Sequence, residues 1–159
     1  MMQLKGQNLC LADVETVYNS LLDPECLANA LPGCKSLSMP EDNVYEGTVE
    51  LGVGPVVGSY KSNVKIEDQE YPKYLKLSAN GKGKTGQVAF TLNLNLHEVE
   101  GGTEAKWEVD AKVSGLVASV GSRVMSGVAR FIAGQFFKNL IKAEQKEKVN
   151  SNLSSQHIK

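Results

Sequence analysis

Hydrophobic and polar residues alternate with a period of two over most of the region from Lys35 to Val113. This period places apolar side chains on one face of a strand and polar side chains on the other. Asn80-Gly81 and Gly101-Gly102 are turn dipeptides, which we expect between strands. The pattern predicts an antiparallel sheet that is apolar on one face and solvated on the other.

After Val113 the apolar spacing changes to three and four residues, which predicts one long helix from Ser114 to about Lys142. Ser114 is a suitable N-cap. Three interior glycines, Gly121, Gly127 and Gly134, are unusual because glycine destabilises helices. They indicate close approach of the helix to the sheet, room for a ligand, or both. The apolar stripe comprises Leu116, Val117, Val120, Val124, Val128, Phe131 and Ile132.

The N-terminal part predicts a strand from Met2 to Leu11 and then two short helices. Asp13 caps the first helix, and Asp23-Pro24 begins the second with aspartate at the N-cap and proline at the first helical position. We expect an α+β fold in which a curved seven-stranded antiparallel sheet wraps around the long C-terminal helix. Residues 1–145 form a single domain in this prediction, and residues 146–159 form a polar, disordered tail.

Composition excludes several function classes. The chain has 159 residues and a net charge of −1, so it offers no field that would attract nucleic acid. Its three cysteines, Cys10, Cys26 and Cys34, indicate reduced thiols in a cytoplasmic protein. None of these residues has the spacing of a metal site. No signal peptide and no membrane-spanning run of about 20 apolar residues is expected.

The sequence predicts no catalytic residue. No strand carries an inward acid–base pair, which general acid–base catalysis requires. His97 lies on the outward phase of its strand and is interpreted as solvated. Cys34 is next to Lys35, which would lower its thiol pKa slightly, but a structural thiol is the favoured interpretation. Gly83-Lys84-Thr85 resembles the end of a phosphate-binding loop but leads into a strand, so it is interpreted as a turn.

The candidate site is a ligand cavity between the apolar face of the sheet and the helix. Trp107 and Phe90 serve either core packing or ligand contact, with packing favoured. Tyr60 and Ser62 point inward with polar atoms, and a ligand carbonyl or an ordered water would satisfy them. The residues predicted to line the cavity are Leu27, Leu31, Tyr60, Ser62, Val64, Leu77, Phe90, Leu92, Leu94, Trp107, Val109, Val117, Val120, Val124 and Val128.

With these features, the chain resembles the helix-grip fold of the START and Bet v 1-like (SRPBCC) superfamily. Within it, the chain is similar to the carbon monoxide dehydrogenase G-subunit family from about residue 2 to 143. The stretches that carry the resemblance are Leu22-Asp23-Pro24-Glu25, Leu31-Pro32-Gly33-Cys34, Val53-Gly54-Pro55-Val56, Gly81-Lys82-Gly83, Gly102-Thr103, Val113-Ser114-Gly115-Leu116 and Val120-Gly121-Ser122-Arg123.

The resemblance implies a non-enzymatic protein with a hydrophobic cavity, linked with the assembly, membrane attachment or quinone supply of molybdenum hydroxylases. Some members carry a C-terminal extension that meets the membrane. This chain ends soon after its long helix, so we expect no membrane contact. We expect no resident cofactor, and a bound quinone or lipid is the candidate ligand.

Three functions remain open. The first is a non-catalytic carrier of a lipid- or quinone-like molecule that serves a carbon monoxide dehydrogenase or related molybdenum hydroxylase. The second is an assembly or accessory protein that acts on such an enzyme through surface contacts. The third is a small-molecule cyclase or hydrolase on the same fold. Fold alone does not choose among them.

Overall fold

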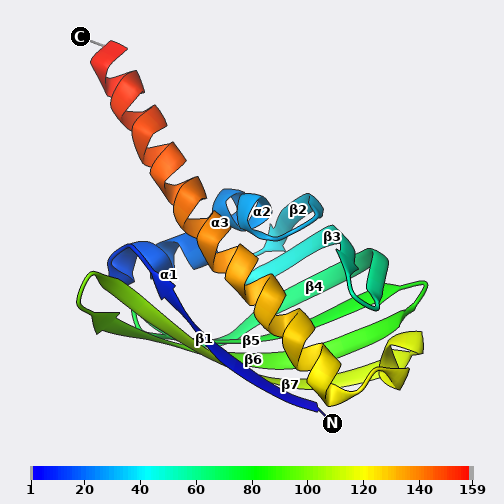
Figure 1. The fold of residues 1–159 in the computed structure, drawn as a ribbon. Coiled ribbons are helices and arrows are strands. Elements are labelled where there is room, and N and C mark those ends of the chain that lie inside the picture. The colour runs from blue at the N-terminus through cyan, green and yellow to red at the C-terminus, as the bar shows by residue number, and fades with distance from the viewer. Residues whose placement is uncertain (1, 158–159) are drawn as a thin grey trace.

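The structure is a computed structural model that describes the backbone of residues 2–157 and the side chains of residues 2–141. A single antiparallel sheet of seven strands curves around one side of a long helix, with the strand order β1-β7-β6-β5-β4-β3-β2 (Figure 1). The elements are β1 (Met2–Cys10), α1 (Val14–Leu22), α2 (Pro24–Ala30), β2 (Cys34–Glu41), β3 (Val44–Val53), β4 (Val56–Glu70), β5 (Tyr74–Gly83), β6 (Gly86–Val99), β7 (Gly102–Gly115), the 3₁₀ turn η1 (Leu116–Ser119) and α3 (Ser122–His157).

The two short helices begin where the capping residues predict. The Asp13 carboxylate accepts a hydrogen bond from the Thr16 backbone N–H at 2.9 Å, and Asp23 accepts one from the Glu25 N–H at 2.9 Å. Pro24 occupies the first turn of α2, where its missing N–H is not needed. These helices close one end of the space between α3 and the sheet (Figure 1).

The predicted start of the long helix is wrong. Ser114 is not an N-cap, because β7 stays paired with β6 as far as Gly115, which lies opposite Gly86. Gly115 has a φ of +82° and turns the chain into η1, and α3 begins only at Ser122. Pairing along β6 therefore continues the strand through a stretch whose local apolar spacing suggests a helix.

The later start shifts the phase of the apolar stripe. Leu116, Val124 and Phe131 are 73%, 49% and 53% exposed, so they do not form the packed stripe that we predicted. From Ser122 onward, the residues of α3 that pack against the core recur at three- and four-residue steps along one helical face. They are Met125, Val128, Ala129, Ile132, Ala133, Phe136, Phe137, Leu140 and Ile141.

The helix glycines do not allow close approach to the sheet. A Cβ built on Gly121, Gly127 or Gly134 would meet no heavy atom within 4 Å. The close-packing interpretation is therefore wrong. Gly121, which precedes α3, and Gly127 are exposed, so the space beside them is open to solvent.

Two other boundaries differ from the prediction. Asn80-Gly81 lies inside β5, with Gly81 between Ser62 and Val88, and the turn to β6 comes after Gly83. The backbone of α3 continues to His157, through most of the stretch that we expected to be a disordered tail. The side chains of that stretch lie outside the described residues, and the domain division remains a prediction.

The core lies where α3 crosses β1, α1 and α2. Trp107 lies over Gly6 of β1, where a Cβ would collide with its ring, and its Nε1 donates to Asn8 Oδ1 at 3.0 Å. Asn139 of α3 donates to the Ala30 carbonyl at 3.4 Å, which joins α3 to the end of α2. This is the helix-grip arrangement.

Candidate functional site

The strand residues predicted to face inward lie on the concave face of the sheet. The register places Val64 opposite Ala79, Ala79 opposite Phe90, and Leu92 between Leu77 and Val109, so these side chains form continuous rows beneath α3. Tyr60, Ser62, Leu94 and Trp107 share that face by the alternation of side chains along each strand.

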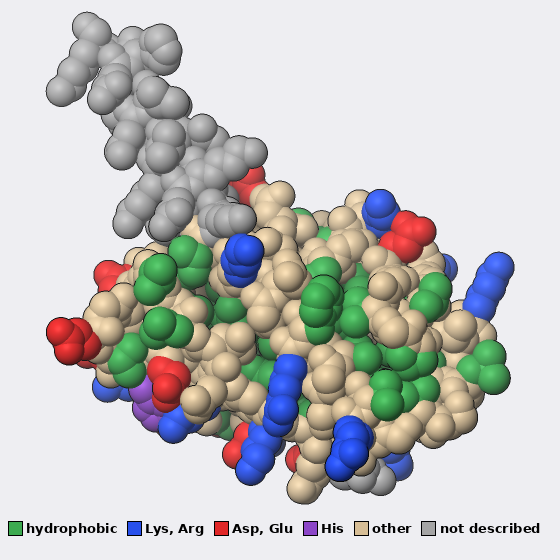
Figure 2. All heavy atoms as spheres, viewed as in Figure 1, with side chains coloured by type: hydrophobic (Ala, Val, Ile, Leu, Met, Phe, Trp, Pro, Cys, Tyr) green, Lys and Arg blue, Asp and Glu red, His purple; other side chains and the backbone are tan. Residues whose placement is uncertain are grey.

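The concave face is covered unevenly. Tyr60, Leu94 and Trp107 are buried, whereas Val64, Leu77, Phe90, Leu92 and Val109 are only half-buried. The reason is that α3 lies mainly against β1 and the short helices rather than over the middle strands. Figure 2 shows hydrophobic side chains gathered to the right of α3, over the part of the sheet that Figure 1 assigns to β3, β4 and β5.

The concave face carries the fewest side chains around Ser62. Its neighbours in the register are Gly47 on β3 and Gly81 on β5, which carry no side chains. A Cβ built on Gly81 would lie 3.6 Å from Ser62 Oγ, its nearest heavy atom, so this position has space above it. The Gly47 position is tighter, because a Cβ there would collide with the Ser36 carbonyl oxygen of β2.

Ser62 offers a polar atom that no other described group uses. Tyr60 hydroxyl lies 2.6 Å from Thr85 Oγ1, and Tyr45 hydroxyl donates to the Leu22 carbonyl at 2.7 Å. Among the described residues, no hydrogen bond involves Ser62 Oγ. We expected a ligand carbonyl or an ordered water to satisfy both hydroxyls. Thr85 instead supplies a partner for Tyr60, while the expectation for Ser62 stays a prediction.

Of the four residues predicted for the site in and before α3, only Val124 is exposed. Val128 is buried, with its Cγ2 3.8 Å from the place of a Cβ on Gly54 in the β3–β4 turn, and Val117 is buried on η1. Val120 is partly buried against the core. Val124 lies about 40° around the helix from Val128, at the exposed rim.

Three inward helix residues were missing from the predicted site. Met125, Ile132 and Phe136 lie within about 40° of one another on the packed face. They are seven and four residues apart, a helical spacing that the sequence contains; Ile132 was already part of the predicted apolar stripe, whereas Met125 and Phe136 were not. Leu27 and Leu31 lie on and just after α2 at the closed end, and both are partly buried.

Ionisable groups are scarce on this surface. The inward positions from Tyr45 to Val53, Tyr60 to Ile66, Leu75 to Gly83, Val88 to Leu96 and Thr103 to Val113 hold no carboxylate, amine or imidazole. His97 is exposed on the outward face, opposite Glu104, as predicted.

The expected effect of Lys35 on Cys34 is not observed. Burial raises the pKa of the Cys34 thiol, and a backbone hydrogen bond with Ser36 offsets only part of that rise. A raised pKa means less thiolate at neutral pH, so the group is a weaker nucleophile than a free cysteine.

The described residues contain no group of three or more His, Cys, Asp or Glu side chains arranged to hold a metal ion. In the same part of the chain, no helix combines the length and apolar character needed to cross a bilayer.

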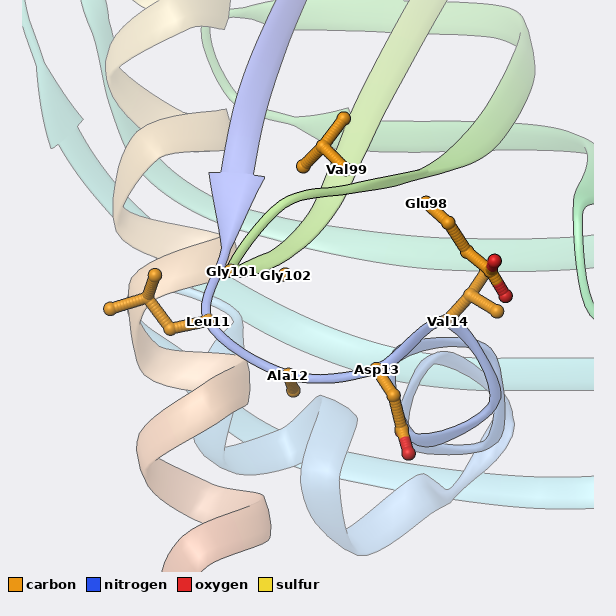
Figure 3. Close-up of a pocket in the computed structure, with 8 residues that line it drawn as sticks. All are labelled: Leu11, Ala12, Asp13, Val14, Glu98, Val99, Gly101 and Gly102. Carbon is orange, nitrogen blue, oxygen red and sulfur yellow. The ribbon is translucent and has the colours of Figure 1, made fainter.

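Two further hollows lie among the described residues. One, of about 830 Å³, is an open depression of the sheet whose lining takes in successive residues of β4, β5 and β6, from Asn63 to Lys65, from Ser78 to Asn80 and from Ala89 to Thr91, together with Val44, Asp110 and Lys112. The other lies at the end of β1 beside the β6–β7 turn (Figure 3).

Comparison with known proteins agrees with the fold. The family model for the G subunit of carbon monoxide dehydrogenase (CoxG) matches residues 6–144. A conserved protein from Geobacillus kaustophilus is 30% identical with a TM-score of 0.84, over 91% of this chain and 96% of that one. No curated protein matches the sequence.

More distant structures share the fold alone. A START superfamily protein from Mycobacterium smegmatis has a TM-score of 0.69 at 11% identity, over 92% of this chain and 99% of that one. Ara h 8.0201 has a TM-score of 0.61 at 16% identity, over 91% of this chain and 97% of that one.

Proposed function

The chain belongs to the carbon monoxide dehydrogenase G-subunit (CoxG) family, and we propose that it is a non-catalytic protein that binds a lipid- or quinone-like molecule. The proposed site is the concave face of the sheet beside the first turns of α3. The observation that carries the proposal is the half-buried apolar surface around Val64, Leu77 and Leu92, which no helix side chain fully covers. Apolar concave surfaces with few polar groups are typical of small-molecule sites.

The chemistry of the surface favours a neutral ligand. A charged group placed there would lose its hydration without finding an opposite charge. Ser62 Oγ can donate to a carbonyl or accept from a hydroxyl, so one polar group on an otherwise apolar molecule suits the site. A neutral lipid with one hydroxyl has this chemistry, and a quinone can accept from Ser62 Oγ with one of its two carbonyls.

We also propose that the carried molecule serves a carbon monoxide dehydrogenase or a related molybdenum hydroxylase, as the name of the family supports. An accessory role through surface contacts is the alternative. The inward positions of β3 to β7 hold no carboxylate, amine or imidazole, which supports binding over a cyclase or hydrolase activity, since these are the commonest proton-transfer groups. Cys10, Cys26 and Cys34 form no disulfide bond with one another, which supports a cytoplasmic location.

The first test is extraction of the purified protein with organic solvent, followed by mass spectrometry of the extract. A stoichiometric quinone or lipid is the expected result. Co-purification of a hydroxylase with a protein that yields no extractable molecule would instead support the accessory role.

The second test locates the site with a matched pair of substitutions in β5. Gly81→Val adds a branched side chain to the floor beside Ser62, and Asn80→Val adds the same side chain to the outward face. We expect Gly81→Val to weaken binding of decylubiquinone at least about tenfold, because the new methyl groups and the ligand compete for one volume. Asn80→Val should bind as the wild type does. Equal affinities in the two variants would contradict the proposed site.

A further inference from the structure

The hollow at the end of β1 has a volume of about 380 Å³ and is formed by two segments some ninety residues apart in the sequence. In Figure 3, Gly101 and Gly102 lie at its centre, Leu11 lies on one side, Val99 above, and Glu98 on the far side. The lining residues are Leu11, Ala12, Asp13, Val14, Glu98, Val99, Gly101 and Gly102.

The fold keeps the floor of this hollow free of side chains. Gly102 pairs with Val99, and a Cβ on Gly102 would collide with the Cys10 carbonyl oxygen. Gly101 has a φ of +85°, a conformation that side chains other than glycine's rarely adopt. Thr103 is fully buried, and its Oγ1 donates to the Ala12 carbonyl at 2.8 Å, which holds the two segments together.

Two large apolar side chains that line the hollow, Leu11 and Val99, are 68% and 39% exposed. Leu9, which does not line it, is 61% exposed. Leu9 and Leu11 are two residues apart, so roughly 7 Å of extended chain separates them. Exposed apolar groups that gather in one place mark interaction surfaces, whereas single ones do not.

The two segments that form the hollow are rich in carboxylates, and Asp13 and Glu98 line the hollow itself. Residues 9–16 and 97–104 contain no lysine or arginine, although the whole chain has a net charge of only −1. Figure 2 shows acidic and hydrophobic side chains together at the left-hand end, where Figure 1 places α1 and the β6–β7 turn. Glu104 is paired with Lys106 at 3.5 Å. The acidic residues of the two segments are Asp13, Glu15, Glu98, Glu100 and Glu104.

We propose that this end of the molecule is a docking surface for a protein partner that places an apolar side chain over Gly101 and Gly102 and sets lysine or arginine against Glu98 and Glu100. Complementary charge around an apolar centre accelerates association and selects the partner. The surface is separate from the concave face, so the proposal does not depend on which ligand the protein carries.

The negative charge of this surface argues against two other occupants, a membrane and a second copy of this chain. An anionic membrane surface attracts basic segments and would repel this rim. A second copy docked through the same surface by two-fold symmetry would bring the two acidic rims together. A basic, apolar segment of another protein avoids both of these charge repulsions.

The test uses the full chain labelled with ¹⁵N and a synthetic hexapeptide with two central leucines and two lysines at each end. We expect saturable shifts of the Gly101 and Gly102 amide signals, and weaker binding as salt rises. Peptides with glutamate in place of lysine, or serine in place of leucine, should cause no such shifts.

Matched variants separate the apolar and charged contributions. Val99→Ser should weaken binding about tenfold, whereas Val57→Ser, at an exposed valine of β4, should leave it unchanged. Glu98→Gln with Glu100→Gln should weaken it about three- to tenfold, and Asp42→Asn with Glu46→Gln should not. All these side chains are exposed, so the melting temperature of each variant should match that of the wild type.

Three results would overturn the proposal. The first is equal binding of the lysine and glutamate peptides, or peptide shifts confined to other residues. The second is binding of phosphatidylglycerol vesicles that Val99→Ser abolishes, which would identify a membrane surface. The third is concentration-dependent dimerisation that the same substitution abolishes, which would identify a second copy as the occupant.

Discussion

At the scale of single residues, Ser62 combines an inward position with a hydroxyl that no described group uses. We predict that Ser62→Ala lowers affinity for a quinone or hydroxyl-bearing lipid by about 0.5–1.5 kcal/mol, the net value of one hydrogen bond. The free energy of unfolding should change little, because no protein hydrogen bond is lost. A titration of both proteins with decylubiquinone measures the effect. Ser59→Ala, at an exposed position of the same strand, is the control, and an equal loss in that variant would contradict the prediction.

Tyr60 differs from Ser62, because its hydroxyl already has a hydrogen-bond partner within the protein. Tyr60→Phe removes the 2.6 Å hydrogen bond to Thr85, which also donates to the Val57 carbonyl at 3.3 Å. We predict a loss of about 0.5–1.5 kcal/mol in the free energy of unfolding, measured with urea. Ligand affinity should stay the same. A loss of affinity without a loss of stability would show that this hydroxyl faces the ligand after all.

The cysteines give a prediction about pH. Burial raises the pKa of Cys34, and it raises the pKa of Cys10 to about 11, so both thiols hold less thiolate at a given pH than free cysteine. Alkylation of Cys34 by iodoacetamide should therefore be slower than that of free cysteine at pH 7 and should accelerate as the pH rises. Cys10 and Cys26 are buried and should stay unmodified in the folded protein. Peptide mass spectrometry measures the alkylation rate of each cysteine. A fast reaction of Cys34 at pH 7 would contradict a raised pKa for its thiol.

At the scale of elements, α3 contains glycines without a packing role. Gly127→Ala and Gly134→Ala add methyl groups that meet no atom within 4 Å. Each should raise the free energy of unfolding by about 0.8–1.0 kcal/mol, the difference between the two residues in a helix interior. Denaturant unfolding of the ligand-free protein measures this gain. Gly102→Ala is the contrasting variant and should destabilise, because its Cβ would collide with the Cys10 carbonyl. Unchanged or reduced stability in the two helix variants would show that α3 requires its glycines.

At the scale of the whole molecule, the open concave face links ligand binding to stability. A ligand that binds only the folded state adds about 2.7 kcal/mol at a free concentration one hundred times its dissociation constant. The solvent-extracted protein should therefore melt at a lower temperature than the protein reloaded with decylubiquinone. Gly81→Val should lose this response while Asn80→Val keeps it. An identical melting temperature with and without ligand in the wild type would contradict binding to the folded state.

The parts of this protein that its sequence determined are those governed by neighbouring residues. Alternation assigned Tyr60, Val64, Phe90 and Leu92 to one face of the sheet, because successive side chains of a strand point to opposite sides. Asp13 and Asp23-Pro24 located two helix starts, because a cap acts on N–H groups within its own first turn. Family motifs spread along most of the chain indicated the helix-grip fold before any contact was known.

Only the tertiary structure decided the features that depend on distant segments. β7 continues to Gly115 because β6 lies beside it, and the resulting late start of α3 moved Val124 to the exposed rim and Met125 to the packed face. Thr85, in the turn between β5 and β6, became the partner of Tyr60 on β4, 25 residues earlier in the chain. The hollow between Leu11 and Val99 exists because Thr103 joins segments ninety residues apart. Local periodicity carries no information about such pairings, since their free energy comes from contacts that form only when the chain has folded.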